Sequence, residues 1–232
     1  MVQDGLASQV EDLTAAGDAA SKLNSETGIS LLDLFLQGGF TMWILLGLSF
    51  IAAWIFVERL FAIIRASRID HRFMEQIKQY VHNGQINYAI DLCRMTNSPI
   101  ARLIEKGLER VGRPLSDVQT AVENMGNLEV GKLERGLPML ATVSGGAPMI
   151  GFLGTVIGMI LAFYNMAAAG SSIDISMLSG GIYLALVTTV GGLIVGIMAF
   201  FGYNYLVSRI ERIIYKMEAN TIEFMDLLNE PV

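Results

Sequence analysis

Two long stretches of this sequence contain no charged side chain. They cover residues 136–173 and 175–208, with Asp174 between them. Because an α-helix rises about 1.5 Å per residue, about 20 apolar residues suffice to cross a bilayer. Each stretch is longer than that, so we predict two membrane-spanning helices. Both stretches carry hydroxyl side chains in apolar surroundings, which favours transport or coupling over soluble chemistry.

A third apolar stretch over residues 38–57 is also uncharged and ends at Glu58-Arg59, where we expect the lipid headgroups to begin. The chain is 53% hydrophobic and only 16% charged, whereas a soluble domain is about 25% charged. Since the apolar residues gather in three blocks, they indicate three spans rather than one large core. We predict an all-α integral membrane protein, with long helices extending into the cytoplasm, in a homo-oligomeric bundle.

The region between the first two apolar blocks is polar and predicted to be helical, with breaks at residues 83–84, 96–99 and 112–114, where Gly, Asn and Pro occur. No strong breaker follows, so the pattern predicts one helix from about 116 to about 168. Pro148 lies inside it and should cause a local kink. After a short connection, the third span is expected to continue as an amphipathic helix.

Lys and Arg predict the orientation. Residues 59–135 hold twelve of the sixteen, and the connection over residues 167–177 holds none. The positive-inside rule therefore predicts a periplasmic N-terminus and a cytoplasmic C-terminus. The predicted divisions are an acidic periplasmic segment with an interfacial helix (1–37), a first span (38–64), a cytoplasmic helical region (65–135), a second span (136–168), a periplasmic loop (169–177), a third span (178–207) and a cytoplasmic helix (208–232).

Residues 1–28 are polar and acidic and lack the basic start and apolar centre of a secretory signal. We therefore expect either that the first span directs insertion or that a signal precedes this sequence.

Small residues dominate the second and third spans. Glycines four residues apart let helices approach closely, and we expect these small faces to be buried between subunits. The residues expected to serve helix packing are Gly151, Gly154, Gly158, Pro148, Gly192 and Gly196.

The spans also carry hydroxyl side chains. Each one, taken alone, is typical of a side chain that bonds the carbonyl one turn back. Yet a bundle that passes protons usually needs an intramembrane Asp, Glu or His, and spans two and three have none. If this chain belongs to a proton path, the titratable group must come from another chain, and the threonines would line the path.

Several segments resemble a known family. The sequence LATVSGGAP at 140–148, followed by GFLGTVIGM at 151–159, resembles the second-span signature of the MotA/TolQ/ExbB proton channel family. The sequence ALVTTVGGL at 185–193 resembles its third span, and Glu58-Arg59-Leu60 resembles the end of its first.

The resemblance implies a pentamer of three-span subunits around two single-span helices of an ExbD- or TolR-like partner, whose aspartate takes the proton. It assigns pore-lining positions to Thr155 and Thr189, and we add the neighbouring Thr188 as a candidate. One departure matters: where many members have a glutamate in the third span, this chain has Leu184, which cannot titrate.

The interpretation that we favour is an ExbB-like subunit in the inner membrane of a Gram-negative bacterium, which drives outer-membrane transport through a TonB-like protein and contacts membrane lipids. The acidic N-terminal segment favours ExbB over TolQ. A TolQ-like or gliding-motility subunit remains an alternative, as does a passive scaffold that packs helices and binds lipid without conducting. MotA itself has four spans and is disfavoured.

We expect no catalytic residue, cofactor, metal or nucleic acid. The net charge is −6, and the lone Cys93 excludes an intramolecular disulfide and is predicted to be a buried packing residue. His71 and His82 have no companions with metal-ligand spacing and are expected to be solvated.

Overall fold

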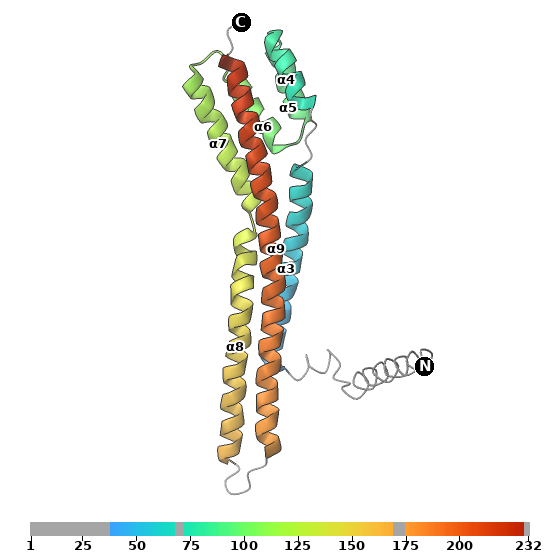
Figure 1. Cartoon of the computed structure of the whole chain (residues 1–232), viewed down its shortest axis with the longest axis vertical. Coiled ribbons are helices and arrows are strands. Elements are labelled where there is room, and N and C mark those ends of the chain that lie inside the picture. The colour runs from blue at the N-terminus through green and yellow to red at the C-terminus, as the bar shows by residue number, and fades with distance from the viewer. Residues whose placement is uncertain (1–37, 68–71, 169–174, 230–232) are drawn as a thin grey trace, which may run out of the picture. The chain divides into compact units, whose positions relative to one another are not determined.

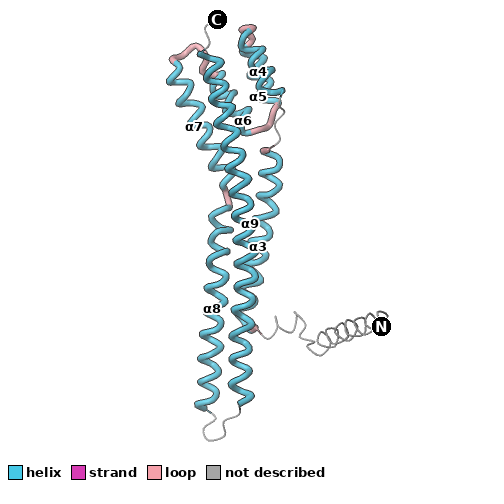
Figure 2. Tube along the Cα trace, viewed as in Figure 1, coloured by secondary structure: helices cyan, strands magenta, loops and turns pink. Residues whose placement is uncertain are grey.

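The computed structural model describes residues 38–67, 72–168 and 175–229. All of these are helices joined by short turns, and no strand occurs among them (Figures 1 and 2). The all-helical fold class is therefore confirmed. With the labels of Figure 1, the helices are α3 (Gly39–Ala66), α4 (Arg72–His82), α5 (Ile86–Met95), α6 (Pro99–Leu108), α7 (Leu115–Glu134), α8 (Leu137–Ala168) and α9 (Ile175–Asn229).

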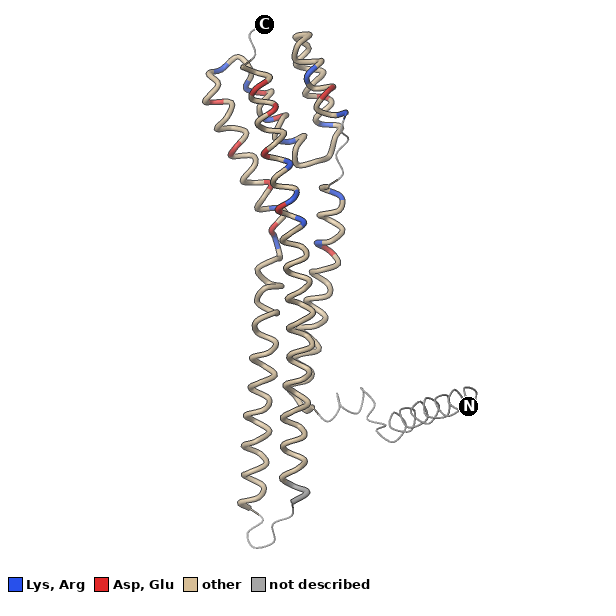
Figure 3. The backbone as a smooth tube through the Cα atoms, in the orientation of Figure 1, with Lys and Arg blue, Asp and Glu red and all other residues tan. Residues whose placement is uncertain are grey.

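Three of the described helical segments are long and apolar enough to cross a membrane. The first is α3. The second is Leu115–Ala168, which contains α7 and α8, and the third is Leu178–Asn229 within α9. Figure 3 shows that charged residues gather on α4–α7, on the end of α3 and on the second half of α9. This is a multi-pass membrane protein, as the three apolar blocks predicted. The predicted N-terminal interfacial helix and most of the loop over 169–177 lie outside the described residues.

The polar region breaks where glycine and proline predicted. Gly84 and Gly112 have φ values of +68° and +92°, which side chains with a Cβ rarely adopt. Pro99 opens α6, and the Ser98 hydroxyl accepts a hydrogen bond from the Ala101 amide at 3.2 Å, which caps the helix. The three predicted interruptions are confirmed.

The prediction of one continuous helix from about 116 to about 168 is wrong. Helix α7 ends at Glu134 and α8 begins at Leu137. Gly136, with φ +85°, occupies the left-handed conformation that commonly ends a helix. Arg59 of α3 supports this end, because its Nη1 donates to the carbonyl of Lys132 in the last turn of α7 at 3.3 Å.

The chain divides into two compact units. The first contains residues 1–43 and 154–188, and the second contains residues 44–153 and 189–232. In the first unit, small residues of α8 and α9 form the contact: Gly158, Ala162 and Ala185 are buried there. In the second unit, α4–α7 and the end of α9 share an apolar core that includes Ile77, Ile100, Ile104, Val122 and Phe224.

The end of α9 is held in that core by a close contact. A Cβ placed on Gly107 of α6 would overlap the fully buried Phe224 ring, so the helices approach where only glycine leaves room. Lys78 of α4 pairs with Glu223 of α9 at 2.7 Å. The single 55-residue helix α9 therefore serves both the apolar span and the polar helical region.

Candidate functional site

The first unit buries one of the three candidate threonines completely. Thr188 is 1% exposed, and its Oγ1 donates to the carbonyl of Ala185 at 2.9 Å. A Cβ added to Gly154 of α8 would lie 2.6 Å from that Oγ1. The Thr188 hydroxyl is therefore satisfied inside the chain, in the contact between α8 and α9.

Thr155 directly follows Gly154 on α8 and is half-buried. Successive helical residues are about 100° apart around the axis, so Thr155 lies to one side of the Gly154–Thr188 contact. One turn further along α8, Gly158 faces α9 at close range, since a Cβ added to Gly158 would lie 3.1 Å from the carbonyl oxygen of Gly181. Leu184, at the position of the family glutamate, lies near the start of α3, with Cδ1 3.9 Å from a Cβ built on Gly39.

The second unit contains the remaining packing residues and the third threonine. A Cβ on Gly192 would lie 2.7 Å from the carbonyl oxygen of Ala147, and one on Gly196 would overlap the Pro148 ring. Thr189 is half-buried, and its Oγ1 donates to the carbonyl of Gly151 at 3.4 Å.

These placements correct the expectation that the small faces meet between subunits. Gly154 and Gly158 in the first unit, and Gly192 and Gly196 in the second, face the neighbouring helix of the same chain. Glycine removes the side chain that would separate two backbones, so antiparallel helices joined by a short connection can use it within one subunit. By contrast, Gly145 is exposed, and its Cβ would meet nothing within 4 Å.

Two further hydroxyls of α8 bond their own helix. Thr142 donates to the carbonyl of Pro138 at 2.8 Å, and Ser144 donates to that of Ala141 at 2.7 Å. Since residues 136–173 and 175–208 contain no Asp, Glu, His, Lys or Arg, the helices offer hydroxyls and carbonyls to a path but no charged or readily titrating group. Such an arrangement conducts protons only with water or with a titratable group from another chain.

The polar helical region holds an ion-pair network that the sequence did not reveal. Glu129 of α7 is 1% exposed; its Oε2 accepts from Arg102 of α6 and its Oε1 from Lys132, each at 2.6 Å. Burial raises the pKa of Glu129, but these two hydrogen-bonded cations outweigh it and hold the pKa below its usual range. Arg102 and Glu129 are 27 residues apart, so no local pattern signals the pair.

The placement of Cys93 agrees with the sequence. It is buried on α5, and burial, with a smaller contribution from the Glu105 carboxylate, raises the pKa of its thiol to about 12. A thiol with this pKa is not a nucleophile at neutral pH. His82 lies exposed at the end of α4, while His71 lies outside the described residues.

The family model described as "MotA/TolQ/ExbB proton channel family" matches residues 95–219, which is more than half of the chain and covers α8 and most of α9. The chain belongs to this family. The matched residues include the three candidate threonines and all six packing positions of α8 and α9.

Several curated relatives carry ExbB names. The chain is 28% identical over 190 residues to the putative biopolymer transport protein ExbB homolog of Methanothermobacter thermautotrophicus, covering 82% of this chain and 67% of that protein. It is 31% identical over 187 residues to the putative ExbB-like 1 protein of Synechocystis, covering 77% and 71%. It is also 36% identical over 149 residues to the biopolymer transport protein ExbB of Aquifex aeolicus, covering 63% and 93%.

Proposed function

We propose that this chain is the ExbB-like subunit of an inner-membrane motor that couples the proton-motive force to TonB-dependent outer-membrane transport. The family match and the ExbB names of its relatives support this role. A TolQ-like or gliding-motility subunit is the second candidate, and the description of the matched family names TolQ beside ExbB. A non-conducting scaffold is the third.

The observation that carries the proposal is the lack of charge in spans two and three. A proton path through α8 and α9 needs a group that binds the proton, and residues 136–173 and 175–208 provide no Asp, Glu or His. We infer that a single-span ExbD- or TolR-like partner supplies an aspartate inside a homo-pentamer of this chain. Leu184 cannot replace it.

Thr155 and Thr189 are the hydroxyls that we assign to the path, while Thr188 is buried against Gly154 in the α8–α9 contact. A charged aspartate at membrane depth costs on the order of 3 kcal/mol on insertion scales. Hydroxyls and water would lower this cost and offer the proton a hydrogen-bonded route. Once protonated, the neutral aspartate can pass the apolar wall, so that the partner turns relative to the pentamer.

The orientation assigned here puts the N-terminus in the periplasm and the C-terminus in the cytoplasm. It rests on the positive-inside rule, since α4–α7 and the second half of α9 carry most of the Lys and Arg (Figure 3). The polar helices would then extend the assembly into the cytoplasm.

The decisive experiment replaces the two threonines assigned to the path, one at a time, by valine, which keeps the shape of the side chain and removes the hydroxyl. We expect Thr155→Val and Thr189→Val to assemble with the partner yet lose proton-driven transport in a complementation assay, and Thr155→Ser to retain part of it. Thr142→Val is the matched control, because that hydroxyl bonds its own helix. Leu184→Ala should cost little activity by comparison. Wild-type transport by both valine variants would show that the proton path lies elsewhere.

A further inference from the structure

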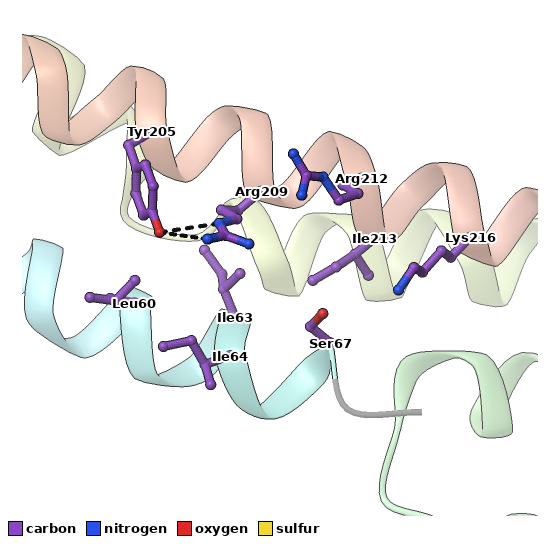
Figure 4. A pocket seen from close by; sticks show the side chains of 9 residues that line it. All are labelled: Leu60, Ile63, Ile64, Ser67, Tyr205, Arg209, Arg212, Ile213 and Lys216. Carbon is purple, nitrogen blue, oxygen red and sulfur yellow. Dashed lines mark hydrogen bonds between the residues drawn. The ribbon is translucent and has the colours of Figure 1, made fainter. Parts of the chain in front are cut away.

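A cleft of about 290 Å³ lies between the end of α3 and the middle of α9, entirely within the second unit (Figure 4). Its floor is apolar, with Ile63 and Ile213 buried at the contact of the two helices. The other described residues that line it are Leu60, Ile64, Ser67, Tyr205, Arg209, Arg212 and Lys216.

The charged side chains that line this cleft in the described part of the chain are all basic. They are Arg209, Arg212 and Lys216, and none of the described lining residues is acidic. Within the described residues, these three cations form no ion pair with a carboxylate. Three cations in one recess with no carboxylate partner among the described residues repel one another, so an anion that enters is favoured.

One of the cations is held in place. The Nε and Nη2 atoms of Arg209 donate to the Tyr205 hydroxyl at 3.2 and 2.9 Å, and the guanidinium lies 5.2 Å from the centre of the Tyr205 ring (Figure 4). Because this contact fixes the guanidinium, less side-chain freedom is lost when an anion binds.

The position of the cleft along the helices identifies the anion. On α3 the uncharged run ends at Val57, and on α9 it ends at Ser208, directly before Arg209. The cleft therefore lies at the depth of the lipid headgroups. Ile64 lines the cleft, and Phe61 lies three residues before it on α3, so the two side chains are neighbours on the helix surface. They expose 46% and 68% of their surface, which gives α3 an exposed apolar face at the cleft.

We propose that this cleft binds one anionic phospholipid, such as a phosphatidylglycerol. Its phosphate pairs with Arg212 and Lys216 beside the fixed Arg209, and its acyl chains lie along Phe61 and Ile64 of α3. Basic recesses between spanning helices are suited to anionic headgroups in this way. An acidic peptide could also pair with the cations in the cleft. To cover the apolar face of α3, however, it would have to place backbone N–H and C=O groups in lipid without hydrogen-bond partners, whereas an acyl chain has no such groups. The proposal rests on the membrane-spanning fold and not on proton conduction.

The test is native mass spectrometry of the 232-residue chain in a neutral detergent. The chain is titrated with dioleoyl phosphatidylglycerol or with dioleoyl phosphatidylcholine, which has the same acyl chains. We expect the anionic lipid to be retained roughly tenfold more tightly, and Arg212→Gln/Lys216→Gln to lose roughly that factor. Arg110→Gln/Arg113→Gln removes the same charge away from the cleft and should bind as the wild type does. Arg212→Lys/Lys216→Arg keeps the charge and should retain the lipid.

Two further measurements distinguish a lipid bound in the cleft from a lipid bound elsewhere and from a free phosphate ion. Ser67→Trp fills the cleft and keeps all three cations, so it should abolish preferential retention of phosphatidylglycerol. Millimolar inorganic phosphate should not displace the lipid, because the acyl chains contribute to binding. Equal retention of the two lipids, wild-type retention by Arg212→Gln/Lys216→Gln or by Ser67→Trp, or displacement by free phosphate would each overturn the proposal.

Discussion

Glu129 illustrates, at the scale of one residue, how a charge stabilises the polar helices. Its carboxylate is buried between α6 and α7 and binds Arg102 and Lys132. Arg102 and Lys132 have side chains that are 33% and 64% exposed, so removing the Glu129 charge leaves them hydrated, and the cost is that of the lost charge-assisted hydrogen bonds, about 1.5–3 kcal/mol. Part of this cost is avoided when the replacement can still accept a hydrogen bond.

We therefore expect Glu129→Gln to lower the free energy of unfolding at pH 7 by about 1–2 kcal/mol. Because the folded-state pKa of Glu129 lies below the unfolded value of about 4.3, its contribution is present above that value and is lost as pH falls through the folded pKa. The wild type and the variant should converge in acid. Thermal unfolding in detergent between pH 3 and 7 measures this, with the exposed Glu123→Gln as control. A constant difference across this range would contradict the assignment.

At the scale of helices, the contact of α8 with α9 depends on backbones that approach where side chains are missing. A Cβ on Gly154 would lie 2.6 Å from Thr188 Oγ1 and 2.7 Å from Thr188 Cβ, so even alanine forces the helices to shift. Overpacking of this kind typically costs about 1–3 kcal/mol. An alanine should be tolerated at Gly145, because a Cβ there has no neighbour within 4 Å.

Gly154→Ala should therefore destabilise the chain, whereas Gly145→Ala should be neutral or stabilising by up to about 1 kcal/mol through helix propensity. Thr188→Gly removes the clashing atoms, so Gly154→Ala should cost less in that background. A double-mutant cycle on thermal unfolding in detergent measures the coupling. Additive effects of the two substitutions would show that the contact does not constrain Gly154.

Local patterns predicted much of this helical arrangement. The interruptions around Gly84, Pro99 and Gly112 were predictable because glycine and proline end helices by local chemistry. The break at Gly136 was missed because one glycine in a glycine-rich segment does not reveal its φ. The ion pair of Arg102 with Glu129 and the cleft between α3 and α9 were missed for another reason: each joins residues that only tertiary packing brings together.

At the scale of the whole molecule, the structure separates two uses of small residues. Gly154, Gly158, Gly192 and Gly196 serve contacts inside one chain, so substituting them tests folding before it tests assembly. Gly145 lies on α8, is exposed and has open space around its Cβ. A pentamer with spans two and three around its pore needs faces of α8 that remain free in the single chain, and Gly145 lies on such a face.

Gly145→Leu therefore probes assembly without a clash inside the subunit. Leucine favours helix over glycine by roughly 1 kcal/mol, so the helix itself should not suffer. We expect native mass spectrometry in mild detergent to show the pentamer for the wild type and smaller species for Gly145→Leu, with helical content unchanged by circular dichroism. Gly154→Leu, its matched partner, should lose thermal stability as well, because leucine there meets Thr188. If Gly145→Leu forms pentamers as the wild type does, that face of α8 is not buried between subunits, and the glycines of α8 serve folding alone.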